Sequence, residues 1–192
     1  VGVDVSAGTS GDTSSNSVLS LWDGYDGEQV GEIAINGLYP IPFARLAVAV
    51  CWWLSPSGEA FLIPETNGGA GRTFMEELMR IGYANLYEAD SGGGEMKYNT
   101  KKSGMPGYHT TRTSTTLEPL LAGLSHQSIT PRSRALIAEC GEYEINQRAQ
   151  WVHPRSVNSR DSSALGEGHG DRAMAAGVAV RAALVGDRAL QE

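Results

Sequence analysis

Three acidic residues stand at positions where a lone carboxylate calls for an explanation. Asp4 lies within the valine-rich stretch VGVDVS, Glu65 closes the apolar run FLIP, and Asp171 opens an alanine-rich segment. An unpaired carboxylate is costly to bury, and three clustered carboxylates repel one another unless a divalent cation neutralises them. Oxygen-only ligands favour Mg²⁺ or Mn²⁺, and two such ions about 4 Å apart can promote phosphodiester hydrolysis. The three acids are therefore candidate catalytic residues and metal ligands, if the fold brings them together.

Each acid also has an ordinary structural explanation. Asp4 could cap the turn that follows it, and Glu65 could pair with Arg72. Asp171 could serve only as an N-terminal helix cap, because carboxylates are favoured there in any case. All three acids stand at the ends of predicted elements, which is harder to attribute to chance.

Two further residues are candidate accessory metal ligands. Asp12, in GTSGDTSS, could return toward Asp4, although the ordinary role of such a residue is an Asx-turn. His169 precedes Asp171 by two residues and could contact a metal or a phosphate, or could simply be a surface histidine at a helix start. The four His and two Cys residues show no zinc-site spacing.

The glycine-rich stretch NGGAGRT follows Glu65 directly and lies between a predicted strand and a predicted helix. Phosphate loops occupy such positions, but the chain has neither a Walker motif nor a GxGxxG fingerprint. We therefore expect the glycines to let the backbone of a bulky polymer approach Glu65. The helix N-terminus and Arg72 would then be available to a phosphate.

Composition sets outer limits on the function. The chain of 192 residues fits one domain with a sizeable core. Its longest apolar run, residues 46–54, is far shorter than the roughly 20 residues that span a bilayer, and no signal peptide is visible. Cys51 and Cys140 sit in apolar surroundings, which predicts buried reduced thiols and an intracellular setting.

Charge is unevenly distributed along the chain. The net charge of −7 argues at first against nucleic acid. However, residues 1–96 hold 3 basic and 13 acidic residues, whereas residues 97–160 hold 9 basic and 4 acidic residues. This pattern is either ordinary scatter or a cationic substrate track beside an acidic metal site.

The polar, Gly- and Lys-rich stretch 90–107 is predicted to be a long flexible loop. Loops of this length are usually functional or disordered. Its residues Lys97, Lys101 and Lys102 are candidate DNA contacts, as is Arg112 just beyond it.

Hydrophobic periodicity and turn signals give the order of elements. Three strands joined by tight turns form a meander, and a small hairpin occurs near residue 150. Thr130 is the predicted N-cap of one helix, with Pro131 in its first turn. Strands are predicted at 1–6, 17–24, 29–36, 59–65 and 85–89, with the hairpin at 142–146 and 149–154; helices are predicted at 40–55, 69–82, 113–124, 130–141 and 169–186.

This order predicts an α/β fold of the ribonuclease H-like class. Such a fold has a mixed sheet, an antiparallel meander extended by parallel strands, with helices on both faces. The first and fourth strands then lie side by side and the last helix packs nearby, so Asp4, Glu65 and Asp171 would converge.

Four stretches together resemble the nuclease domain of the large terminase subunit of tailed bacteriophages. They are VGVDVSAGTSGDTS, IPETNGGAG, GYHTTRTSTTLEPLLAGL and GHGDRAMAAGVAV, and the resemblance covers nearly the whole chain. It implies a two-metal-ion endodeoxyribonuclease, dependent on Mg²⁺ or Mn²⁺, that cuts concatemeric double-stranded viral DNA during genome packaging. The resemblance also implies that the metal ligands of this chain are Asp4, Glu65 and Asp171.

The resemblance also implies partners and a setting. In the family an ATPase motor domain precedes the nuclease. The start of this chain at Val1 predicts that residues 1–192 are a single nuclease domain without the motor. Full-length partners would be the small terminase subunit and the portal, in the host cell cytoplasm and without a membrane.

The chain departs from the family pattern at two positions. Gly170 stands where the family commonly has the first of two adjacent acids, so a second ion would be held more loosely. Ser114 stands where a basic residue is usual, and Arg112 is the candidate substitute.

Three other functions fit parts of the pattern. A junction resolvase or another ribonuclease H-like nuclease would share the three acids. An actin-like ATPase would use VGVDVSAGTSGD as its first phosphate loop, although no second loop or adenosine site is evident. A DNA-clamping module without catalysis would have no need to keep all three acids.

Overall fold

The centre of the protein is a four-stranded sheet, seen in a computed structural model. The model describes residues 1–8, 15–57, 60–87, 107, 113–147, 151–153 and 170–189. The strands are β1 (Gly2–Asp4), β2 (Ser17–Asp23), β3 (Glu28–Ile35) and β4 (Ile63–Pro64), in the order β3-β2-β1-β4. Strands β1, β2 and β3 are antiparallel neighbours, and β4 runs parallel to β1. The predicted meander with a parallel extension is confirmed.

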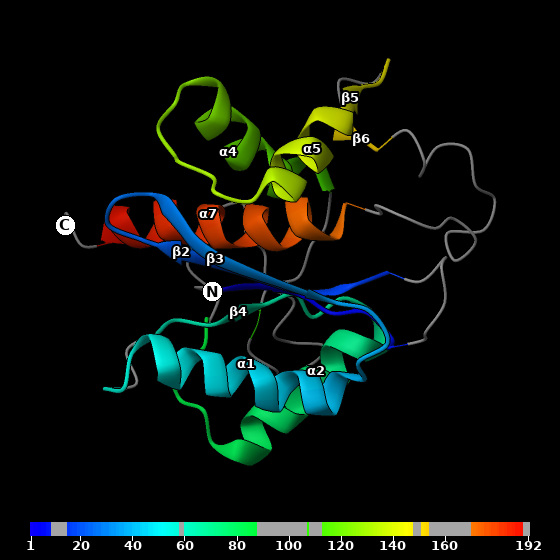
Figure 1. Ribbon diagram of the computed structural model, residues 1–192, viewed down its shortest axis with the longest axis vertical. Helices are drawn as coiled ribbons and strands as arrows, with labels where there is room; N and C mark the ends of the chain where they lie inside the picture. Colours follow the sequence, from blue (N-terminus) through cyan, green and yellow to red (C-terminus); the bar gives the residue numbers. More distant parts are fainter. Residues whose placement is uncertain are drawn as a thin grey trace.

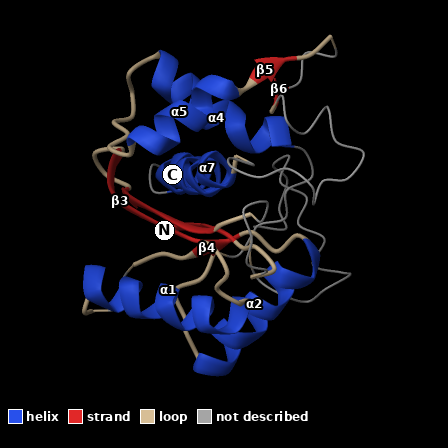
Figure 2. Ribbon diagram, turned by 45° about the vertical axis from the view of Figure 1, so that its right-hand side comes forward, coloured by secondary structure: helices blue, strands red, loops and turns tan. Residues whose placement is uncertain are grey.

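Helices cover both faces of this sheet, as the sequence predicted (Figure 1). One face carries α1 (Pro40–Leu54) and α2 (Gly68–Ile81). The other carries α7 (Asp171–Ala189), with α4 (Thr113–Ser125) and α5 (Arg134–Glu142) packed beyond it (Figure 2). The chain therefore has the ribonuclease H-like α/β fold that the element order predicted.

The core is divided between the two faces of the sheet. On the face covered by α1 and α2, Phe43 and Phe74 pack against each other with ring centroids 5.6 Å apart. On the opposite face, a second cluster joins α4, α5 and α7 through residues such as Leu117, Leu136 and Ala176. Small residues bring α7 close to the sheet: a Cβ added to Gly2 would lie 2.1 Å from the carbonyl oxygen of Ala175. This close approach fixes the height of α7 above β1.

Three further sequence predictions have different outcomes. The predicted strand at 85–89 is reduced, among its described residues, to a single parallel bridge between Leu86 and Leu62. The hairpin is confirmed as β5 (Glu144–Ile145) and β6 (Trp151–Val152). The predicted loop at 90–107 lies outside the described residues, except for Gly107.

The predicted helix start at Thr130 is wrong. Thr130 instead extends the sheet edge beside β3, because its carbonyl oxygen accepts a 2.9 Å hydrogen bond from the N–H of Gln29. The helix begins at Arg134, and the Ser133 side chain caps it by accepting from the N–H of Leu136 at 3.1 Å. The pairing of Thr130 with β3, which is distant in the sequence, thus prevails over the local capping signal at Thr130.

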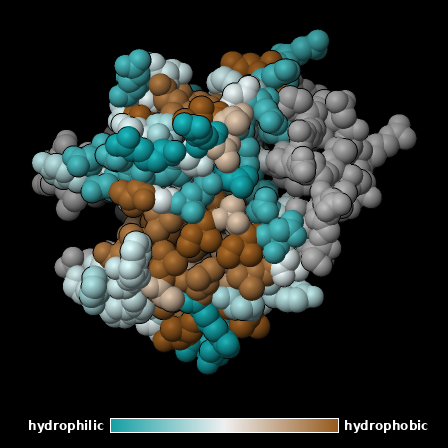
Figure 3. Space-filling view, in the orientation of Figure 1, coloured by the Kyte–Doolittle hydropathy of each residue, from teal (hydrophilic) through white to brown (hydrophobic). Residues whose placement is uncertain are grey.

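Apolar side chains gather on the lower part of the surface seen in Figure 3, where α1 and α2 lie. On α1, Ile41, Trp52 and Trp53 are exposed. Within the described residues, no helix combines the length and the apolar character that a membrane crossing requires.

Candidate active site

Asp4 and Glu65 stand at the same end of two adjacent parallel strands. The register pairs Val3 of β1 with Pro64 of β4, and the N–H of Glu65 donates to the carbonyl oxygen of Val3 at 2.9 Å. Glu65 therefore follows its strand at the level where Asp4 ends β1. The parallel pairing of β1 with β4 thus brings these two acids close together, as predicted.

Asp171 reaches the same region from the opposite layer. It is the first residue of α7, which packs over β1, and its side chain is 6% exposed. Its Oδ2 accepts a 2.6 Å hydrogen bond from the backbone N–H of Asn16, in the segment that leads into β2. The carboxylate is thus directed across the layers toward the sheet.

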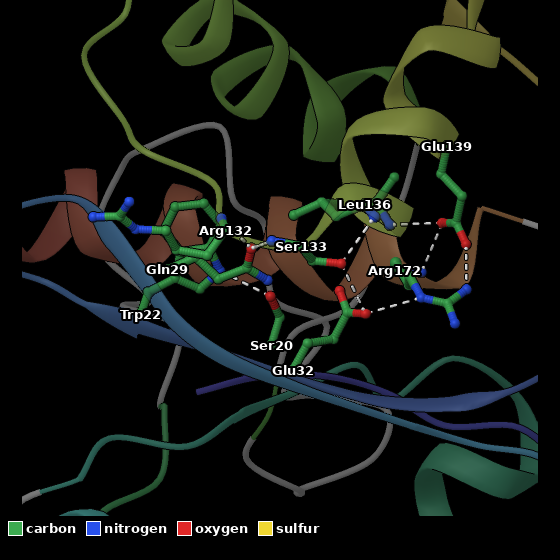
Figure 4. A network of polar contacts seen from close by, with 10 residues as sticks. Ser20, Trp22, Gln29, Glu32, Arg132, Ser133, Leu136, Glu139 and Arg172 are labelled. Carbon is green, nitrogen blue, oxygen red and sulfur yellow. Dashed lines mark hydrogen bonds and ion pairs between the residues drawn. The ribbon is translucent and has the colours of Figure 1, made fainter.

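The first turn of α7 is capped by another residue, Glu139 of α5. The Oε2 of Glu139 accepts from the N–H of Arg172 at 3.0 Å and of Ala173 at 3.1 Å, while its Oε1 accepts from Nη1 of Arg172 at 2.9 Å. Nε of Arg172 also donates to Oε1 of Glu32 on β3 at 2.9 Å (Figure 4). Because Glu139 supplies the cap, the carboxylate of Asp171 is left to act elsewhere.

The three carboxylates influence one another's charge. The pKa of Asp4 is raised well above its ordinary value, chiefly by burial and then by the charges of Glu65 and Asp171. Hydrogen bonding with the Glu65 side chain raises this pKa further, because it favours the neutral form of Asp4. The mutual repulsion of the three acids thus disfavours full ionisation of the group.

The geometry bears on metal binding in two ways. Among the described residues, no three His, Cys, Asp or Glu side chains are gathered closely enough to form a ready metal site. The donor chemistry nevertheless fits a divalent cation, because the donors are carboxylate oxygens and a cation would offset the repulsion that raises the pKa of Asp4. We therefore use the term carboxylate group for Asp4, Glu65 and Asp171.

The glycines after Glu65 have separate roles. Gly68 has φ +71°, a conformation that side chains disfavour, at the start of α2. Gly71 lets α2 pack on the strand end, since its Cβ would lie 2.5 Å from the carbonyl oxygen of Glu65. Gly69 has open space where its Cβ would be. Arg72 is exposed in the same first turns of α2.

Sequence reasoning missed the residues that orient the carboxylate group. The Asn67 side-chain amide donates to Oε1 of Glu65 at 2.8 Å, and Glu139 sets the start of α7 as described above. Asn67 follows Glu65 by two residues, so its place in the ETNGG stretch was a usable signal. Glu139 lies 33 residues from Arg172, and no sequence signal pointed to its role.

Gly170, which departs from the family pattern, is sterically constrained. Its φ is +81°, and a Cβ there would lie 2.0 Å from the hydroxyl oxygen of Tyr143. An acid at residue 170 would therefore collide with Tyr143 in this arrangement.

Several predicted site residues fall outside the described part of the chain. They are Asp12, His169, Lys97, Lys101, Lys102 and Arg112. Their roles as accessory ligands or DNA contacts stay predictions.

Comparison with solved structures identifies the fold. The large terminase nuclease of thermophilic phage G20c, solved with bound cobalt, is 19% identical, and the match covers 94% of this chain and 78% of that chain with a TM-score of 0.57. The chain has the fold of a large-terminase nuclease domain. The magnesium-bound G20c nuclease matches with the same identity and coverage at a TM-score of 0.58.

A second phage gives the same result. The large terminase nuclease domain of Thermus phage P74-26 is 19% identical, and the match covers 93% of this chain and 75% of that chain, with a TM-score of 0.56. No protein-family model and no curated protein sequence matches the chain. The terminase-nuclease fold is thus carried here by a strongly diverged sequence.

Proposed function

We propose that this protein is a metal-dependent endonuclease that cuts double-stranded concatemeric DNA during viral genome packaging. The observation that carries the proposal is the carboxylate group, which comes from β1, the end of β4 and the start of α7 on a large-terminase nuclease fold. Neighbours of this fold were solved with cobalt or magnesium, which supports a divalent-ion requirement.

Each acid has a defined part in this proposal. Asp4 and Glu65 would hold one side of the ion site from adjacent strand ends, and Asn67 orients Glu65. Asp171 would close the site from α7, held by the N–H of Asn16. Two bound Mg²⁺ or Mn²⁺ ions would supply an acidified water and offset the charge of the leaving oxygen.

The proposed DNA contacts are basic residues, of which the structure describes Arg72. Arg72 is exposed on the helix that begins just after Glu65, so it supports a phosphate contact at the site's edge. We also propose contacts from Lys97, Lys101, Lys102 and Arg112. In a longer protein, the proposed partners are an ATPase motor domain, the small terminase subunit and the portal.

The test is cleavage of supercoiled plasmid with Mn²⁺ or Mg²⁺. The parent protein should nick and linearise the plasmid, and EDTA should stop it. Asp4→Asn should lower the rate by at least about 100-fold, because it removes a charged metal ligand from the reaction centre. It should not lower the melting temperature, because burial and two neighbouring carboxylates already disfavour a charge at Asp4 and raise its pKa.

Asp26→Asn is the matched control for this experiment. Asp26 is exposed in the β2–β3 turn, at the end of β2 remote from Asp4, so its loss should leave cleavage unchanged. Full activity of the Asp4→Asn protein would contradict the proposal. Preference for four-way junctions over linear duplexes would favour a resolvase instead.

A further inference from the structure

Tyr143 is a buried tyrosine beside the carboxylate group. It lies between α5 and β5, with a side chain that is 7% exposed, and it packs in the cluster that joins α4, α5 and α7. Its ring meets the His153 ring edge-on with centroids 5.2 Å apart, and Nε2 of His153 lies 2.9 Å from Oε2 of Glu142. These contacts fix the direction of the phenol.

That direction is toward the first turn of α7. The Tyr143 hydroxyl occupies the space that a side chain at Gly170 would need, with 2.0 Å between its oxygen and an added Cβ. It therefore lies against the backbone that presents Asp171. The pKa of Tyr143 is raised, first by burial and then by the charges of Glu139, Cys140, Asp4 and Asp171, in that order. The phenol thus keeps its proton and can act only as a neutral donor or acceptor.

The hydroxyl has no hydrogen-bond partner within the described parts of the chain. The hydroxyl oxygen is not among the fully enclosed, unpartnered side-chain atoms of the described residues, so an incoming acceptor can reach it. Of the nearby acids, Asp171 accepts through its Oδ2 from the N–H of Asn16. This arrangement favours an acceptor that arrives with a ligand.

We propose that the Tyr143 hydroxyl donates a hydrogen bond to a phosphate oxygen of DNA bound at the carboxylate group. This inference rests on the proposed nuclease function. A phosphodiester is the acceptor that the reaction must bring beside Asp4 and Asp171, and a neutral donor can contact it without repelling the cations. A preorganised donor of this kind also stabilises charge that develops on the phosphate during cleavage.

The test compares Tyr143→Phe with Tyr83→Phe. Tyr83 is equally buried, and its hydroxyl donates to the carbonyl oxygen of Ala60, before β4 and away from the strand ends that carry the acids. Three quantities are measured on each protein: the cleavage rate constant at saturating DNA with Mn²⁺, the Kd for a short duplex with Ca²⁺ in place of Mn²⁺, and the Mn²⁺ concentration that gives half of the thermal shift.

In Tyr143→Phe, the cleavage rate constant should fall about 100-fold, as when a transition-state donor is removed. The duplex Kd should rise about tenfold, the size of a lost hydrogen bond to a charged group. The Mn²⁺ midpoint should match that of Tyr83→Phe. Equal cleavage and equal binding in the two variants would overturn the inference, and so would a shifted Mn²⁺ midpoint, which would place the phenol in the metal site.

These results separate the inference from the proposed function. If the parent protein cleaves, Asp4→Asn does not, and Tyr143→Phe behaves like Tyr83→Phe, the nuclease stands and the role of Tyr143 falls. If the parent protein does not cleave, the duplex Kd still reports on the hydroxyl, and an unchanged Kd overturns the inference.

Discussion

At the scale of single residues, the three acids are held by unlike means. Glu65 is fixed by a strand-end hydrogen bond and by Asn67, whereas Asp171 is fixed through the backbone of Asn16. Asp4 depends on its neighbours, because burial and the charges of Glu65 and Asp171 raise its pKa. Each acid therefore has its own environment, and each can be altered separately.

Glu65→Gln should separate metal binding from stability. Removing one of three repelling charges should leave the melting temperature equal or higher without metal. In the parent protein, Mn²⁺ at 100 times its Kd should add about 2.7 kcal/mol of stability, and Glu65→Gln should abolish this gain. The measurement is a thermal shift series with Mn²⁺ and with ATP. Protection of the parent protein by ATP would instead favour the actin-like ATPase.

Two glycine variants provide the contrast for that series. Gly69→Val places a branched side chain in open space near Glu65, so the Mn²⁺ shift should survive while DNA cleavage falls. Gly71→Ala should lose the Mn²⁺ shift and cleavage together, because its Cβ would press on the carbonyl oxygen of Glu65 and displace the strand end. If Gly69→Val cleaves DNA like the parent, no DNA backbone passes over this turn.

At the scale of elements, the start of α7 decides where Asp171 points. Within the described parts of the chain, the cap is supplied by Glu139 of α5, and Arg172 joins α5 to β3 through Glu139 and Glu32 (Figure 4). The carboxylate group therefore depends on the docking of α5 as well as on α7 itself.

Glu139→Ala should destabilise the protein and impair the site together. Loss of the cap leaves the N–H groups of Arg172 and Ala173 without their acceptor and should cost about 2 kcal/mol. Urea denaturation measures this loss, and plasmid cleavage should fall with it because Asp171 shifts. Glu118→Ala, at an exposed position on α4, should change stability by less than about 0.5 kcal/mol. Equal stability of the two variants would show that α7 needs no cap from α5.

At the scale of the whole molecule, charge is divided between an acidic site and a basic middle segment. The first 96 residues carry both strand-end acids, and residues 97–160 carry 9 of the 15 basic residues. A nuclease needs both, since cations neutralise the acids while basic residues engage the DNA backbone.

Changing Lys97, Lys101 and Lys102 to Ala should weaken DNA binding equally for all sequences. Each lost phosphate contact should reduce the magnitude of the salt slope by about one unit, because fewer counterions are released on binding. The measurement is duplex affinity as a function of salt concentration for two unrelated sequences. An unchanged slope would remove these lysines from the DNA interface, without bearing on the carboxylate group.

The sequence by itself determined the local elements and the candidate acids. Alternation and turn residues predicted β2 and β3, and amphipathic periodicity predicted α2 up to its stop at Gly82, which adopts a left-handed conformation. Parallel pairing of the first and fourth strands then placed Asp4 beside Glu65. These features depend on contacts near in sequence or on one strand pairing, and such patterns can be read along the chain.

Only the tertiary structure decided how the site is completed. Thr130 pairs with β3 instead of capping a helix, so α5 begins at Arg134 with Ser133 as its cap. Asp171 is oriented by Asn16, 155 residues away, and Glu139 rather than Asp171 caps α7. The Tyr143 hydroxyl fills the space beside Gly170, where the family pattern commonly has an acid. No local signal encodes these contacts, because each exists only once packed layers bring distant backbone and side chains within hydrogen-bonding or van der Waals distance.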